Sequence, residues 1–186
     1  MKKTFLIILL FNFSLSVAQT EKDLLSNDIK GYIKAINNND IEKQIKYYPK
    51  FAFDSISKEE YIKHFKKASA EYNNSTVVMD SVFTLDTIMT INSVKYARIN
   101  TRQQVTMDLS DLKDENGMSY AMSMMYGYLV HTYGEDNVSY KKGEWIFHIT
   151  NKDPTYAIKE DNWTFLQLSE ENEIHIPKEI RKPIEK

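Results

Sequence analysis

The four histidines are the side chains of this chain best suited to ligate a metal ion or to move a proton near neutral pH. They are His64, His131, His148 and His175. They do not have the spacing of metal ligands, either with each other or with an acid one helical turn away on a common inner face. The sequence therefore predicts no metal site. Because the neighbours of His148 along the chain are apolar, we expect its imidazole to be exposed.

Motifs for nucleophilic or nucleotide chemistry are also missing from the sequence. It contains no Gly-x-Ser-x-Gly and no glycine-rich phosphate loop, and only five glycines in all. A nucleic-acid partner would require a basic cluster, whereas the formal net charge is −2 and the basic residues are dispersed. We therefore expect no cofactor and no nucleic acid, and the sequence favours a protein that is not an enzyme.

Methionine and tyrosine are concentrated between residues 118 and 128. The cluster includes Met118, Met122, Met125 and Tyr126, and these two residue types form adaptable contact surfaces. One interpretation is a lid or a partner-binding surface made by these four residues. The other is an ordinary helix packed on a sheet, and the spacing leaves both open.

Helices are predicted to position the N-terminal third of the chain. Apolar residues recur at helical spacing from Leu25 to Ile36. Asp40 is a suitable N-cap for a second helix. Ser57 and Glu60 form a capping box at the start of a third helix, because each side chain can bond the backbone N–H of the other.

From residue 75 onward, the apolar period changes to 2, which indicates strands. The clearest strand is Val94–Leu109, with one apolar and one polar face, preceded by a turn at Asn92 and Ser93. Since most strands run 3 to 10 residues, roughly, a bend or bulge is expected within it. The other predicted strands are Lys50–Asp54, Thr76–Leu85 with an extension to Ile91, Val138–Tyr140, Glu144–Thr150, Thr155–Glu160 and Trp163–Leu168.

Between the long strand and the next one, residues 118–133 are predicted to form an inserted helix. Met122, Met125 and Leu129 have helical spacing, and Gly134 is well placed to end the helix. Tyr126 and the residues that follow it would also suit a strand. The order of elements predicts an α+β fold in which N-terminal helices pack on a curved antiparallel sheet.

This order resembles the NTF2-like superfamily, the cone-shaped α+β fold that includes ketosteroid isomerases and SnoaL-type proteins. The likeness is carried by four segments, namely Ala35–Ile41, Tyr47–Phe53, Ser57–Tyr61 and Trp163–Leu166. It covers most of the chain as a pattern and not as a strict motif. The helix at residues 118–133 departs from the family, in which a plain hairpin is usual at that place.

The resemblance implies a cone that encloses a pocket. The apolar faces of the helices and the inward-facing alternate residues of the strands would line this pocket. One residue predicted to line this pocket, Gln103, carries a polar amide on an otherwise apolar strand face. Such an amide needs a hydrogen-bond partner when it is buried. It is either a ligand contact or a satisfied amide of the core or rim. The predicted lining residues are Tyr48, Phe53, Phe65, Gln103, Val105, Met107 and Trp145.

Isomerases of this family use a carboxylate base beside an oxyanion-stabilising pair, one of which is a tyrosine. Asp54 is the acid that follows the segment predicted as the first strand, and Tyr32, Tyr48 or Tyr156 could supply a phenol. No spacing selects among these residues. Asp54 is better explained as a turn or cap residue ahead of Ser57, so no catalytic residue is assigned.

The first eighteen residues have the pattern of a cleavable export signal. Lys2 and Lys3 precede an apolar run from Phe5 to Phe11, and small residues stand at Ser16 and Ala18. Cleavage would leave Gln19 first. Since the chain has no cysteine, it can form neither a disulfide nor a lipid-anchored cysteine. We expect a soluble, unlipidated protein, periplasmic or secreted, without a membrane anchor.

The predicted organisation is a signal peptide over residues 1–18, a single domain over 19–168 and a loose tail over 169–186, with one turn of helix at Lys178–Arg181. For its function we expect a non-catalytic module that binds a small apolar ligand or a protein partner. One alternative is an isomerase- or hydrolase-type enzyme with a carboxylate in the cone. The other is an interaction protein that forms a homodimer.

Overall fold

The fold is an α+β arrangement of helices around two antiparallel sheets, seen in a computed structural model that describes residues 20–71, 75–110, 118–141, 143–169 and 172–181. The predicted α+β class is thereby confirmed, with two antiparallel sheets in place of the single curved sheet expected. The predicted signal at residues 1–18 lies outside the described residues. No helix among the described residues is long and apolar enough to cross a bilayer.

The N-terminal helices begin where the sequence supplies caps. Helix α2 (Glu21–Asn37) is capped by Thr20, which exchanges hydrogen bonds with Asp23. Helix α3 (Ile41–Gln44) is capped by Asp40, as predicted. Two 3₁₀ turns follow, η1 (Ile45–Tyr47) and η2 (Lys50–Phe53). The predicted capping box at Ser57 and Glu60 is formed at the start of α4 (Lys58–Glu71).

Two expectations in this part of the chain are wrong. Residues 50–54 are not a strand, because Pro49 leads into a 3₁₀ turn whose alternating apolar residues only resemble a strand pattern. Residues 76–91 are not one strand but three short ones, β1 (Thr76–Met79), β2 (Thr84–Leu85) and β3 (Met89–Ile91). The long predicted strand does bend, and it forms β4 (Val94–Asn100) and β5 (Gln103–Asp108).

The bend in the long strand is matched by a bend in its partner. Strand β5 pairs with β7 (Ile146–Asn151), and β4 pairs with β8 (Thr155–Lys159). At the bend, the Thr101 and Thr155 hydroxyls lie 3.0 Å apart and are both buried. One sheet has the order β1-β5-β7-β6, with β6 at Val138–Lys141, and the other has the order β2-β4-β8-β9, with β9 at Trp163–Gln167 and β3 beside β4.

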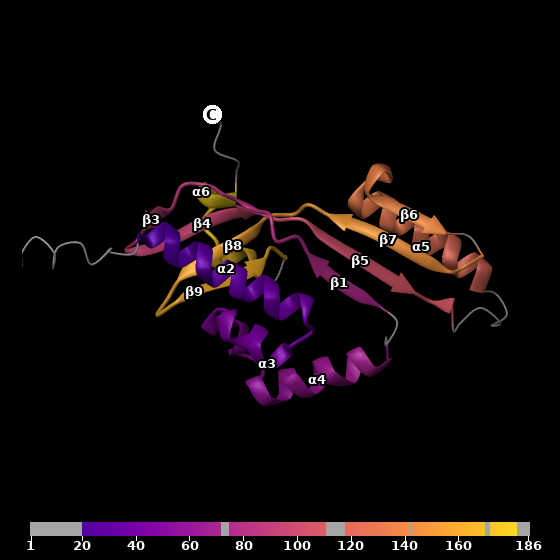
Figure 1. Cartoon of the computed structure of the whole chain (residues 1–186), viewed down its shortest axis with the longest axis horizontal. Coiled ribbons are helices and arrows are strands. Elements are labelled where there is room, and N and C mark those ends of the chain that lie inside the picture. The colour runs from indigo at the N-terminus through magenta and orange to yellow at the C-terminus, as the bar shows by residue number, and fades with distance from the viewer. Residues whose placement is uncertain (1–19, 72–74, 111–117, 142, 170–171, 182–186) are drawn as a thin grey trace, which may run out of the picture.

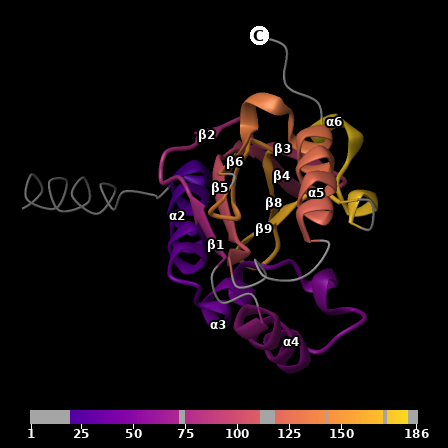
Figure 2. The ribbon, with the colours of Figure 1, turned by 90° about the vertical axis from the view of Figure 1, so that its right-hand side faces the viewer.

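Separate helices cover the two sheets. Helix α2 packs Leu25 and Ile29 on the face of β4, β8 and β9 that carries Ala97 and Phe165. The inserted segment is a helix, α5 (Met118–Tyr133), which packs Met122 and Leu129 on β6 and β7. Figure 1 shows α2 and α5 toward opposite ends of the molecule, and in the end-on view of Figure 2 the strands lie between them.

The C-terminal segment packs against the sheet and is not a loose tail over its described part. The turn η5 (Glu173–His175) and the short helix α6 (Lys178–Arg181) lie on the face of β8 and β9 opposite α2. Ile176 and Ile180 are 1% and 3% exposed there. The expected turn of helix at Lys178–Arg181 is confirmed as α6. The packing of the segment was not predicted, because Ile176 and Ile180 are separated by Pro177 and charged residues.

Candidate functional site

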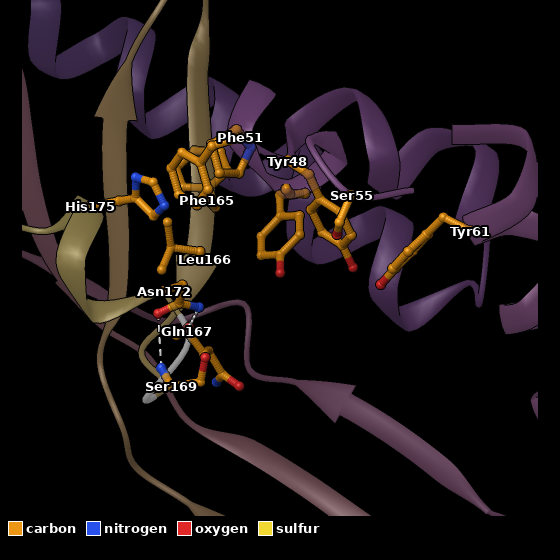
Figure 3. Close-up of a pocket in the computed structure, with 13 residues that line it drawn as sticks. Tyr48, Phe51, Ser55, Tyr61, Phe165, Leu166, Gln167, Ser169, Asn172 and His175 are labelled. Atoms are coloured by element: carbon orange, nitrogen blue, oxygen red, sulfur yellow. Dashed lines mark hydrogen bonds between the residues drawn. The ribbon is translucent and has the colours of Figure 1, made fainter. Parts of the chain in front are cut away.

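A pocket of about 550 Å³ opens at the free edge of β9. That volume lies within the range of ~300 to 1,000 Å³ typical of small-molecule sites. Three parts of the chain that are distant in sequence build it, as Figure 3 shows. The described lining residues are Tyr32, Tyr48, Pro49, Phe51, Ala52, Ser55, Tyr61, Phe165, Leu166, Gln167, Ser169, Asn172 and His175.

Aromatic rings form the inner wall of the pocket. Tyr32 of α2 stacks on Phe165 of β9 with ring centroids 5.3 Å apart. Tyr48 meets the Tyr61 ring of α4 edge to face at 5.8 Å. Phe53 supports both from behind, 6.4 Å from Tyr48 and 6.0 Å from Tyr61. Such offset and edge-to-face pairs fix the orientation of each ring, so the wall is preformed.

The C-terminal segment closes one side of the pocket. The His175 imidazole stacks on the Phe51 ring with centroids 3.8 Å apart and planes 11° apart. Asn172 braces the same segment, because its Nδ2 donates to the Gln167 carbonyl and its Oδ1 accepts from the Ser169 amide. Both ends of the Asn172 amide are thus occupied by the protein itself.

The electrostatics of the pocket are those of a neutral site. None of its described lining residues is Asp, Glu, Lys or Arg. Burial, with smaller contributions from the Tyr32 and Tyr61 side chains, raises the pKa of the Tyr48 phenol well above its usual range. Burial also raises the pKa of Tyr32. Both phenols therefore stay protonated at physiological pH and act as hydroxyl groups and not as charges.

One polar group at the pocket lacks a partner. The Nε2 atom of Gln167 is buried and has no hydrogen-bond acceptor among the described residues. Gln167 is the last residue of β9, where its side chain shares a face with Ile99 and Thr155. A buried amide nitrogen without an acceptor costs free energy of about 1 to 3 kcal/mol.

The structure does not bring the predicted lining residues together. Tyr48 lines the pocket and Phe53 lies directly behind it. Phe65 is half-buried on α4, and Gln103 is half-buried on β5 opposite Met79. The remaining three, Val105, Met107 and Trp145, pack in the cluster under α5.

The predicted lid or partner surface has a different composition in the structure. Met122 is 2% exposed in the core cluster under α5, and Met125 and Tyr126 pack against the same cluster. The side chain of Met118 lies outside the described part of the chain. The exposed apolar residues of α5 are instead Tyr120, Met124 and Tyr128. The face of α5 that carries Met122, Met125 and Tyr126 therefore packs on the sheet.

The candidate acids and bases are also placed away from the pocket. Asp54 is exposed and follows η2 as its C-cap, as the turn interpretation predicted. Tyr156 is buried on the opposite face of the sheet, where its hydroxyl donates to the Arg181 carbonyl. His148 is exposed beside Thr106. Among the described residues, no group of three or more His, Asp or Glu side chains could hold a metal ion.

Most of the actual lining was missed because it comes from residues that look unrelated in the sequence. The sequence pattern predicts a strand at Phe51 and a tail at Asn172 and His175. Phe165 and Gln167 lie on the strand that the tail then covers. Alternation along residues 163–167 correctly placed Phe165 on a strand, but nothing local shows that this strand is an edge.

Comparisons with protein-family models, with curated proteins and with solved structures found no match to this chain.

Proposed function

We propose that this chain is a non-catalytic binding module that holds a small, ring-bearing ligand in the pocket at β9. The observation that carries the proposal is the preformed aromatic wall of Tyr32, Tyr48 and Tyr61, which meets a neutral polar edge at Gln167. Aromatic rings supply contact area at little cost in conformational entropy. Because their orientations are fixed by mutual packing, little ordering is needed when a ligand enters.

The carboxylate-enzyme alternative receives less support from the geometry. A general base must lie within hydrogen-bond reach of the group it deprotonates. The described lining of the pocket contains no carboxylate, and Asp54 faces solvent. His175 is the one imidazole in this described lining, and its ring is stacked flat on Phe51. We therefore favour binding over catalysis.

The wider identity of the module is part of the same proposal. Two observations support an NTF2-like cone: the helices α2 and α3 precede the strands, and the paired bends of β4–β5 and β7–β8 curve the sheets. Export through the signal at residues 1–18 fits a chain without cysteine. We propose a soluble, unlipidated member of that superfamily in the periplasm or outside the cell.

Ligand-observed NMR with a library of uncharged aromatic and alicyclic fragments tests the binding function. We expect saturable binding by the wild-type protein, and a loss of at least tenfold in affinity for Phe51→Ala, which opens the wall beside His175. Tyr128→Ala on α5 is the matched control, because this ring is 66% exposed and is not part of the pocket lining. Absence of saturable binding, or equal losses in the two variants, would overturn the proposal. Circular dichroism confirms that both variants are folded.

A further inference from the structure

The pocket carries more polar side chains than an apolar ligand could satisfy. Eight of its thirteen described lining residues have a hydroxyl, amide or imidazole group. Figure 3 shows the hydroxyl ends of Tyr48 and Tyr61 pointing toward the side of the pocket where Gln167 and Asn172 lie. A hydrocarbon-like ligand would remove water from these groups and return no hydrogen bonds. The polar lining therefore selects against such a ligand.

A charged ligand is disfavoured for a separate reason. The described lining offers no Arg, Lys, Asp or Glu to pair with an ion. Transfer of an unpaired charge out of water is far more costly than transfer of a neutral hydroxyl, which needs only a hydrogen-bond partner. The ligand class that remains is neutral, carries several hydroxyl or carbonyl groups, and has an apolar face for the aromatic wall.

From this geometry we infer that the pocket binds a neutral sugar ring. A pyranose has an apolar C–H face, which fits the partly exposed rings of Tyr48 and Phe51. It also has a rim of hydroxyls, which fits the polar groups of Tyr48, Tyr61 and Gln167. Asn172 positions the C-terminal segment, since its amide makes one hydrogen bond to the Gln167 carbonyl and one to the Ser169 amide.

This inference rests on the proposed binding function and narrows the class of ligand to neutral sugars. It replaces the apolar ligand that the sequence led us to expect. A neutral sugar is held by hydroxyl-to-hydroxyl and hydroxyl-to-amide bonds, each modest in water. Substitution of Tyr61 by phenylalanine removes one such group and retains the ring. A neutral hydrogen bond of this kind corresponds to a loss of about three- to tenfold in affinity.

Saturation-transfer NMR and calorimetry with the full chain test the inference. The probes are glucose, galactose, mannose and N-acetylglucosamine as neutral sugars, glucuronate and glucosamine as charged ones, and cyclohexylmethanol as an apolar ring. We expect a neutral sugar to bind most tightly, with three- to tenfold weaker binding by Tyr48→Phe, Tyr61→Phe and Gln167→Leu. Tyr128→Phe on the exposed face of α5 is the control that leaves binding unchanged.

The outcomes separate the two proposals. Preference for cyclohexylmethanol over every neutral sugar would overturn the sugar assignment and leave the binding function standing. Preference for a charged sugar would overturn it as well. If neither these probes nor the fragment library binds saturably, the binding function itself fails. Equal affinity of Tyr61→Phe and the wild type for the bound sugar would place the sugar elsewhere on the protein.

Discussion

At the scale of single residues, the chemistry of the pocket depends on buried phenols. Tyr48 combines burial with the neighbouring rings of Tyr32 and Tyr61, and each of these influences favours the protonated phenol. A carboxylate in the same position would be strongly disfavoured as an anion and would need a compensating partner. The tyrosines give the pocket directional hydrogen-bonding groups without an ion, which is why the site is suited to neutral ligands.

The raised pKa of the Tyr48 phenol predicts a loss of stability at alkaline pH. In the unfolded chain, a tyrosine phenol ionises at about pH 10. In the folded state, Tyr48 stays protonated to higher pH. The contribution is therefore fully present below pH ~10 and is lost as the pH rises above it, by up to about 1.4 kcal/mol per pH unit. Urea unfolding at pH 8, 10 and 11 measures this. We expect Tyr48→Phe to reduce this alkaline loss of stability and Tyr128→Phe, at an exposed position, to leave it unchanged. The same pH dependence of stability in both variants would contradict the attribution of the loss to Tyr48.

Gly31 on α2 is required by the close approach of Tyr47. A Cβ at Gly31 would lie 2.9 Å from Cζ of Tyr47 and nearer still to its hydroxyl oxygen. The Tyr47 ring is itself packed against Tyr32 and Phe165, so it has little room to move. Gly31→Ala should therefore destabilise the protein by about 1 to 3 kcal/mol, the usual cost of overpacking.

Gly127 on α5 is the matched control for this substitution. A Cβ at Gly127 meets nothing within 4 Å. Alanine is the better helix former by up to about 1 kcal/mol, so Gly127→Ala should be neutral or stabilising. Chemical denaturation of both variants gives the two free energies of unfolding. Stabilisation of similar size by both substitutions would show that Tyr47 does not occupy the space at Gly31.

At the scale of elements, α5 illustrates how one helix contains both buried and exposed methionines. Met122 is 2% exposed against β6 and β7, whereas Met124 is 60% exposed. Met122→Ala should cost about 2 to 5 kcal/mol, because it leaves a cavity in the core. Met124→Ala should change the free energy of unfolding by about 0.5 kcal/mol or less. The reverse order in thermal or urea unfolding would place the other face of α5 on the sheet.

The C-terminal segment offers a second pair of identical side chains in different surroundings. Ile176 is 1% exposed beneath β8 and β9, and Ile174, two residues earlier, is 79% exposed. We expect Ile176→Ala to destabilise the protein by about 2 to 5 kcal/mol and Ile174→Ala to have no measurable effect. Because His175 lies between them, Ile176→Ala should also weaken ligand binding in the pocket. A loose tail would make both substitutions silent.

The elements that the sequence predicted well are those with local signals. Asp40 and Ser57 cap helices through hydrogen bonds that reach only three residues along the chain. Asn92 and Ser93 form a tight turn with φ of 49° and 67°, a conformation that asparagine tolerates better than most residues. Such interactions depend on neighbours in sequence, so a residue pattern is sufficient to identify them.

The pocket could not be predicted in the same way, because its contacts join distant segments. Only Tyr48 of the predicted lining residues is part of it. Phe51 meets His175 through the packing of the C-terminal segment on β9, and that packing depends on which strand is the edge. Strand order is a property of the whole sheet. Alternation along a strand identifies its two faces but does not identify its neighbours.

At the scale of the whole molecule, two bent strands join the parts that the helices cover separately. Strands β4 and β5 follow one another across Thr101, and β7 and β8 follow one another across the segment that ends at Thr155. The buried hydroxyl pair at the bend connects the α2-covered sheet to the α5-covered sheet. The pocket lies on the first of these sheets, at an edge that the N-terminal helices and the C-terminal segment both reach.

The beginning of the fold gives a test of the proposed export. Cleavage after Ala18 would leave Gln19 and Thr20 before α2, so the hydrogen bonds of the Thr20 cap with Asp23 would be retained. The new α-amino group would stand near the helix N-terminus, where its charge is unfavourable, but Glu21 and Asp23 in the first turn offset it. Expression of the full chain with an intact secretion pathway should therefore yield a folded protein whose N-terminal sequencing begins at Gln19. Retention of residues 1–18, or cleavage within α2, would refute the signal assignment.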